Sequence, residues 1–294
     1  MTIALDELNR STSSRFIEAL GGIYEHSPWV AEAVANKRPF ASLAALHEAM
    51  RQAVVTADEA RKRALIEAHP DLAGKAARAG TLTSHSKAEQ ESAGLDRLSE
   101  KEFARFQELN ESYRRKFGFP FIICVRRHGK ESIFRQFEAR LKNDKRAEQD
   151  AALAEIACIA ALRLDQHVSG PDKLPVHGRL STHVLDNHAG RPAEGVALTL
   201  RELFAAGDSR VIVETRTNAD GRTDAPLIAG RPVPIARYEL TFAIGGYFRK
   251  RGIALADPPF LDEVPVRFSV AEPEGHYHVP LLITPWSYAT YRGS

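Results

Sequence analysis

The sequence of 294 residues lacks a long apolar run, a surplus of charge of either sign, and a cysteine-rich stretch. No segment approaches the roughly 18 apolar residues that span a bilayer, and the opening MTIALDELNRSTSS lacks the basic start and apolar middle of a signal peptide. We therefore expect a cytoplasmic protein without a membrane partner. A net charge of +2 with no long basic stripe also argues against nucleic acid as a partner and favours a small polar metabolite.

The chain has only two cysteines, and both lie among aliphatic residues. Cys124 is part of FIICVR, and Cys158 is part of EIACIAAL. Because a free cysteine packs as a small apolar side chain, this setting favours buried, reduced thiols over a disulfide or a metal-binding pair.

Length and periodicity divide the chain into two domains. With 44% hydrophobic residues, a chain of this length can bury one large core or two ordinary ones. The helical period dominates residues 1–166, residues 167–178 have the glycine and proline content of a linker, and residues 179–294 form short segments rich in β-branched side chains. The predicted fold class is therefore multidomain, with an all-α domain followed by an all-β sandwich.

Helix boundaries are recognisable in the first domain. Serine side chains accept hydrogen bonds from the free N–H groups of a first helical turn, and glycine adopts the left-handed backbone that ends many helices. Helix starts are predicted at Ser27 before Pro28, at Ser42, and at Ser99 with Glu102 as a capping box, and one helix end is predicted at Gly118.

Strand patterns fill the second domain. LSTHVLD, GVALTLREL, RVIVETRT, ARYELTFAI and VPVRFSVAE are separated by turn signals such as NHAG and NADG, as in an antiparallel sandwich. In the last long strand, alternate apolar residues from Tyr277 to Ile283 share one parity and are expected to face a core. His276 and His278 have the opposite parity, so they should lie on the outer face of the sheet.

Three features of the first domain are candidates for a site. His69 precedes Pro70, so its backbone avoids the α region and the imidazole should lie at a helix end, either as a cap of the C-terminus or as a functional group. Ser86 and Glu89 have capping-box spacing, and a helix start also offers N–H groups to an anionic substrate. Arg163 lies on the apolar stripe of the last helix, where a buried guanidinium needs a carboxylate partner.

The segments HPDLA, SKAEQESAGL and KFGFPFIICVR together resemble 2-oxo-4-hydroxy-4-carboxy-5-ureidoimidazoline (OHCU) decarboxylases, and the resemblance runs from about Leu8 to Leu164. Alanine stands at position 73, where glycine is common in that family. The resemblance implies a catalytic role for His69 as the acid, with Glu89 beside it, and places Arg163 next to the site. The substrate-binding residues that it implies are Pro70, Ser86, Glu89, Gln90, Phe121, Ile122, Ile123, Cys124, Val125 and Arg163.

The chemistry of this substrate class fits those residue types. The carboxylate of OHCU is attached to a carbon beside a ring C=N, so the electrons released with CO2 are accepted by the substrate without a cofactor. The protein needs only to orient the substrate and move a proton. We therefore expect no cofactor in this domain.

Two residues of the second domain are candidates, and each has an ordinary structural explanation. His183 lies on a strand with parity opposite to that of Thr182 and Val184, and a single strand histidine is commonly a surface residue. Arg222 follows the turn pair Asp220–Gly221, where an exposed arginine needs no function.

STHVLD, TNADGR, HYHVP and the terminal YRGS match, in order and spacing, the pattern of 5-hydroxyisourate hydrolases, the enzymatic relatives of transthyretin. This resemblance covers Leu180 to Ser294. It implies a catalytic cluster of His183, Arg222 and His278, which also binds the substrate. The further substrate contacts that it implies are Tyr291, Arg292 and Ser294.

A metal is not expected in the second domain. The sequence has no HExxH, the cysteines belong to the first domain, and attack of water on an activated lactam does not require a metal. Because histidines on an outer sheet face form a flat wall, we expect a homo-oligomer whose hydrolase sites lie at a subunit interface.

The two resemblances together predict a bifunctional enzyme of urate degradation. The C-terminal domain would hydrolyse 5-hydroxyisourate to OHCU, and the N-terminal domain would decarboxylate OHCU to (S)-allantoin and CO2. The alternative is a transthyretin-like ligand carrier fused to a helical interaction module, in which His183, Arg222 and His278 have no catalytic task.

Overall fold

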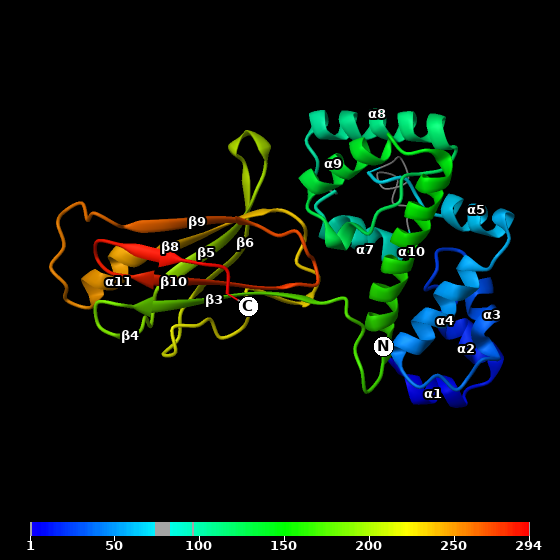
Figure 1. The fold of residues 1–294 in the computed structure, drawn as a ribbon, viewed down its shortest axis with the longest axis horizontal. Coiled ribbons are helices and arrows are strands. Elements are labelled where there is room, and N and C mark those ends of the chain that lie inside the picture. The colour runs from blue at the N-terminus through cyan, green and yellow to red at the C-terminus, as the bar shows by residue number, and fades with distance from the viewer. Residues whose placement is uncertain (1, 74–82, 96, 294) are drawn as a thin grey trace. The chain divides into compact units, whose positions relative to one another are not determined.

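The computed structural model describes residues 2–73, 83–95 and 97–293, and these form two compact units (Figure 1). One unit comprises Met1–Arg126 and Ser132–Val176, and the other comprises Arg127–Glu131 and His177–Ser294. Ser294, one of the predicted substrate contacts, lies outside the described residues.

The described residues of the first unit are helical, as predicted, apart from one short pair of parallel strands in which Ile3 pairs with Val168. No helix of the described part is long and apolar enough to cross a membrane. The elements are β1 (Ile3–Ala4), α1 (Leu5–Arg10), α2 (Ser13–Leu20), α3 (Trp29–Ala35), α4 (Leu43–Val55), α5 (Glu59–Glu67), α7 (Ser84–Ser92), α8 (Glu100–Phe117), the 3-10 turn η1 (Val125–Arg127), α9 (Lys130–Arg140), α10 (Lys145–His167) and β2 (Val168–Ser169).

The helix boundaries follow local chemistry. The side chains of Ser42 and Ser99 cap α4 and α8, with the predicted capping box to Glu102, and α8 ends at Gly118 with φ 81°. The start predicted at Ser27 is displaced, because α3 begins at Trp29 and has no side-chain cap. The buried faces of these helices form one apolar core that includes Cys124.

The described residues of the second unit form strands and one short helix. The elements are β3 (Gly178–Asp186), β4 (Arg191–Pro192), β5 (Ala197–Leu203), the 3-10 turn η2 (Ala205–Gly207), β6 (Ser209–Arg216), β7 (Ile228–Arg231), β8 (Arg237–Ala243), α11 (Ile244–Lys250), β9 (Glu263–Ser269), β10 (His276–Ile283) and β11 (Tyr288–Thr290).

Two sheets enclose the core of this unit. One has the strand order β11-β10-β3-β4 with β7 also paired to β3, and the other has the order β6-β5-β8-β9. Buried residues from both sheets belong to one apolar cluster, as in a sandwich. The expectation of a purely antiparallel sandwich was wrong, because β3 and β10 run parallel. Alternation along a strand identifies its buried face but not the direction of its neighbour.

Helix α11 was not predicted. Its GG pair has low helix propensity, but Ile244, Tyr247 and Phe248 are buried at helical spacing and fix the segment by tertiary packing. The hydroxyl of Tyr247 donates to the buried carboxylate of Asp186 at 2.8 Å, which ties α11 to the end of β3.

Candidate active sites

His69 follows the end of α5, and its two ring nitrogens have different tasks. Nδ1 lies 2.9 Å from the carbonyl oxygen of Leu65. Since a carbonyl only accepts, Nδ1 carries the proton and Nε2 of the neutral ring has the lone pair. Burial lowers the pKa of His69, more than the hydrogen bond to Leu65 and the charge of Glu25 raise it. The helix-cap interpretation is thus correct. It uses only Nδ1, so the lone pair on Nε2 can still accept a proton.

The capping-box interpretation of Ser86 and Glu89 was wrong. The N-cap of α7 is Thr83, whose hydroxyl accepts from the backbone N–H of Ser86 at 3.2 Å. Ser86 therefore lies within the first turn, and its own hydroxyl donates to Glu25 Oε1 at 3.1 Å. The sequence obscured this because Thr83, Ser84 and Ser86 are all residues that favour an N-cap.

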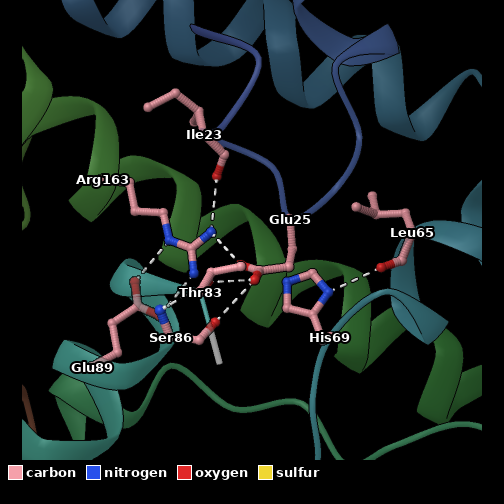
Figure 2. Close-up of polar contacts among 8 residues, drawn as sticks. All are labelled: Ile23, Glu25, Leu65, His69, Thr83, Ser86, Glu89 and Arg163. Atoms are coloured by element: carbon pink, nitrogen blue, oxygen red, sulfur yellow. Dashed lines mark hydrogen bonds and ion pairs between the residues drawn. The ribbon is translucent and has the colours of Figure 1, made fainter. Parts of the chain in front are cut away.

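Arg163 has two carboxylate partners in the helical unit (Figure 2). Its side chain is 2% exposed. Nε and Nη2 form a forked pair with Glu89 at 2.8 and 2.9 Å, and Nη1 donates to Glu25 at 2.7 Å. The requirement predicted for a buried guanidinium is therefore met, and Arg163 acts on α7 through Glu89.

Glu25 is a site residue that the sequence analysis missed. It is 3% exposed and accepts hydrogen bonds from Thr83, Ser86 and Arg163. Burial raises its pKa, but the charge of Arg163 and the hydrogen bonds outweigh this, so the pKa of Glu25 is lowered overall. It lies in the connection between α2 and α3, where no periodicity or capping pattern marks a buried residue. With two carboxylates and one guanidinium, the cluster beside neutral His69 has a net charge of −1.

A pocket in the helical unit collects most of the predicted substrate-binding residues. Cys124 and Arg163 are not in its described lining: the backbone N–H of Cys124 donates to Glu155 at 2.8 Å, and Arg163 contacts the lining residue Glu89. The described lining is His69, Pro70, Leu72, Ser86, Glu89, Gln90, Phe121, Ile122, Ile123, Val125 and Ile159.

A buried ionic network holds the wall formed by residues 121–125. Nη1 of Arg140 donates to the carbonyl oxygen of Ile122 at 2.6 Å, and its guanidinium lies 4.7 Å from the centre of the Phe121 ring. Arg140 pairs with Glu148, which is fully buried and also accepts from Tyr113. This network explains how a segment without regular hydrogen bonding keeps one shape.

The loop that contributes Leu72 to the lining is also fixed by side chains. Gln90 Oε1 accepts from the backbone N–H of Ala73 at 3.0 Å, and Asn110 donates to the carbonyl oxygen of Leu72 at 2.9 Å. Ala73 has φ 50°, in the left-handed region that glycine adopts at lower cost. This left-handed backbone explains why glycine is common at position 73 in the family, where this chain has alanine.

In the second unit, the candidate histidines lie on the outer face of one sheet. β3 and β10 are paired in register, with His278 opposite Ser181 and His183 opposite Pro280. Alternate residues share a face, so both histidines face the same side. The alternate residues Tyr277, Val279, Leu281 and Ile283 of β10 face the core, as predicted.

Arg222 is held beside His183 by its turn. The two residues form an antiparallel bridge, and Asn218 Oδ1 accepts from the backbone N–H of Arg222 at 3.2 Å. Gly221, with φ 72°, has no room for a side chain, because a Cβ would lie 2.3 Å from the carbonyl oxygen of Val184. Arg222 is exposed, but the turn places its charge at the histidines.

Both histidines are less basic than usual. Burial lowers the pKa of His183, and Arg222 lowers it further; His183 Nε2 is buried and has no hydrogen-bond partner among the described residues. Burial also lowers the pKa of His278, with added effects from the charges of Arg222, His183, His276 and Arg179. Neutral imidazoles, which can accept protons, therefore predominate at neutral pH.

The C-terminal segment returns to this cluster. The backbone N–H of Gly293 donates to the carbonyl oxygen of His278 at 2.8 Å. A Cβ at Gly293 would lie 2.8 Å from Cδ2 of His278, so glycine is needed for this close approach. Tyr291 is 60% exposed, and Arg292 stacks 4.8 Å from the ring of Tyr277.

These two units define a class: a two-domain protein in which each domain holds a cluster of charged and polar side chains around histidine. Residues 9–165 match the OHCU decarboxylase family, and residues 180–293 match the HIUase/Transthyretin family, where HIUase denotes 5-hydroxyisourate hydrolase. The chain belongs to both families, with the decarboxylase domain first and the hydrolase/transthyretin domain second.

Known proteins are similar to each half of this chain and to the whole chain. An OHCU decarboxylase from Haloferax volcanii is 41% identical over 167 residues, which are 57% of this chain and 97% of that protein. A 5-hydroxyisourate hydrolase from Ralstonia nicotianae is 52% identical over 118 residues, which are 40% of this chain and 99% of that protein. The crystal structure of an (S)-allantoin synthase aligns with a TM-score of 0.52 and 34% identity over 99% of this chain and all of that one.

Proposed function

We propose that this chain is a bifunctional cytoplasmic enzyme of urate degradation. Its second domain hydrolyses 5-hydroxyisourate to OHCU, and its first domain decarboxylates OHCU to (S)-allantoin and CO2, so domain order is the reverse of reaction order. The observation that carries the proposal is that one chain holds both clusters: His69 with Glu89 and Gln90 in a pocket, and His183 with Arg222 and His278 on one sheet face.

In the hydrolase domain, the histidines divide the proton transfers between them. Neutral His183 accepts a proton at Nε2 from water as the water attacks the lactam carbonyl, and Arg222 stabilises the oxygen that becomes negative. His278 donates a proton to the ring nitrogen as the C–N bond breaks. The carbonyl carbon becomes a carboxylic acid group, which releases one proton to solvent to give the carboxylate of OHCU. His183 then returns its proton to solvent, and the proton that His278 gave is replaced from solvent.

In the decarboxylase domain, the protein orients the substrate and moves one proton. Carbon 4 of OHCU bears the hydroxyl and carboxyl groups. As its bond to CO2 breaks, the electron pair passes into the adjacent C=N, and the ring nitrogen takes a proton from solvent. Neutral His69 accepts the hydroxyl proton at Nε2 and delivers it to carbon 5 on one face. Glu89 accepts from ureido N–H groups, and Gln90 donates through its NH2 group, since Ala73 occupies its oxygen.

Turnover separates this proposal from a carrier function. Freshly made 5-hydroxyisourate should lose its absorbance much faster with the full chain than in buffer. A carrier that only binds the compound would leave its decay at the spontaneous rate or slow it. That outcome would contradict the proposed hydrolase.

The hydrolase should lose activity in acid. The pKa values of His183 and His278 are both lowered from 6.5, so each ring is half protonated only at a pH below that value. We expect kcat/KM for hydrolysis to stay level from pH 8 to pH 6.5 and to fall at lower pH, since protonated His183 cannot act as a base. A pH profile corrected for spontaneous decay measures this, and a midpoint above pH 6.5 would contradict it.

The hydrolase site requires a second copy of the chain in our proposal. The cluster lies on an outer sheet face, while small-molecule sites are concave. Tyr291, which is 60% exposed, comes two residues before Gly293, which pairs with His278. Deleting residues 291–294 should abolish hydrolysis and leave decarboxylation of supplied OHCU within about twofold, because the two sites share no residue. Sedimentation at assay concentration should show an oligomer, whereas a fully active monomer would contradict the shared site.

A further inference from the structure

Two residues outside the predicted cluster connect His278 to solvent. Ser181 lies opposite His278 in the β3–β10 register and is 9% exposed. Its Oγ is 3.0 Å from Nδ1 of His278 and 3.4 Å from Nε2 of His276. His276 itself is exposed. We propose that His276 and Ser181 form a proton relay that sets the tautomer of His278 and replaces the proton that it donates; this inference rests on the proposed hydrolase function.

The hydroxyl group of Ser181 gives the proton relay a direction. When Nε2–H of His276 donates to Ser181, the Ser181 hydroxyl donates to Nδ1 of His278, and His278 keeps its own proton on Nε2. This is the tautomer that can protonate a leaving nitrogen. Without Ser181 as a donor, the proton of neutral His278 can equally occupy Nδ1, which leaves Nε2 unable to donate.

The relay balances the proton transfers of the reaction. As Nε2 of His278 gives its proton to the substrate nitrogen, Nδ1 takes the proton of Ser181, Ser181 takes the Nε2 proton of His276, and His276 takes a proton from water at Nδ1. One proton enters at His276 and one leaves at His278, and no residue gains charge. The three relay residues then return to their first protonation states by exchange of protons with solvent.

The surroundings of His278 favour this relay over a mechanism in which His278 is a positively charged imidazolium before it donates its proton. Arg222, Arg179 and two other histidines lie close enough to disfavour a positive charge on this ring, and burial disfavours it more. A neutral His278 that passes a proton onward avoids that cost. Nε2 of His183 has no hydrogen-bond partner in the described part of the chain, which agrees with its separate role as the base.

Substitutions at Ser181 and His276 test the relay in the full-length protein. Ser181→Ala and His276→Ala should each lower kcat for hydrolysis by about tenfold, part of the range for a general acid, and change KM by less than about twofold. Ser181→Thr, which keeps the hydroxyl, should restore most of the rate. Added imidazole should raise kcat of His276→Ala several-fold and leave that of the wild type unchanged.

Two controls distinguish the possible failures. His188→Ala removes an exposed histidine of the same domain and should leave kcat unchanged. Decarboxylation of supplied OHCU reports that the helical unit of each preparation is folded, while an unchanged KM and the rescue by threonine or imidazole report the same for the second unit. If the wild type hydrolyses 5-hydroxyisourate but both alanine variants keep its kcat, the relay is wrong. A loss that appears in KM, or that neither threonine nor imidazole repairs, would also overturn it. If the wild type itself does not hydrolyse the compound, the proposed function fails instead.

Discussion

Replacing His69 by alanine is expected to lower the rate of OHCU decarboxylation by about 10²- to 10⁴-fold, the range for loss of a general acid or base. Hydrolysis of 5-hydroxyisourate should continue at the wild-type rate, because its proposed residues lie in the other unit. OHCU should then accumulate and lose CO2 slowly in solution. No protein wall selects the protonated face there, so the allantoin formed should be racemic.

Circular dichroism of the product measures this effect, since a racemate gives no signal. His85→Ala is the matched control: His85 lies on α7 next to Ser86 but is exposed, so its removal should leave rate and stereochemistry unchanged. Optically pure allantoin formed by His69→Ala at the wild-type rate would show that proton transfer takes place elsewhere.

Removal of Arg163 should destabilise the helical unit strongly. Arg163→Met leaves Glu25 and Glu89 without their cation, and Glu25 is 3% exposed. Breaking a buried ion pair from one side costs about 3–5 kcal/mol in the free energy of unfolding. The chain has two tryptophans, Trp29 in the helical unit and Trp286 in the other. Trp29 fluorescence in a Trp286→Phe background therefore reports unfolding of the helical unit in the full chain.

A triple variant shows whether the uncompensated charges of Glu25 and Glu89 cause the loss of stability. Arg163→Met with Glu25→Gln and Glu89→Gln removes the two carboxylates as well and should recover much of the lost stability. In Arg163→Met alone, burial should raise the pKa of Glu25 above its unfolded value, so the loss should be smaller near pH 5 than near pH 8. A single variant within about 1 kcal/mol of the wild type would contradict the structural role assigned to Arg163.

The sequence predicted features that depend on neighbours along the chain. The caps at Ser42 and Ser99, the helix end at Gly118 and the outward parity of His278 each follow from a few adjacent residues, and the structure confirms them. His69 is similar, because Pro70 fixes its place at the end of α5.

Features that depend on contacts across the fold were missed. Glu25 contacts Ser86 and Arg163, which are 61 and 138 residues away in sequence, and no local pattern marks that carboxylate as buried. The parallel pairing of β3 with β10 likewise joins the two ends of the second domain. Helix α11 forms against its local propensity because its apolar side chains are buried.

The most direct test of the central claim is the enantiomeric composition of allantoin formed from 5-hydroxyisourate by the full-length chain alone. Both proposed reactions must occur, and the second must be faster than spontaneous loss of CO2, for a single enantiomer to accumulate. We expect stoichiometric (S)-allantoin with no lasting pool of OHCU. Racemic allantoin, or 5-hydroxyisourate that decays no faster than in buffer, would contradict it.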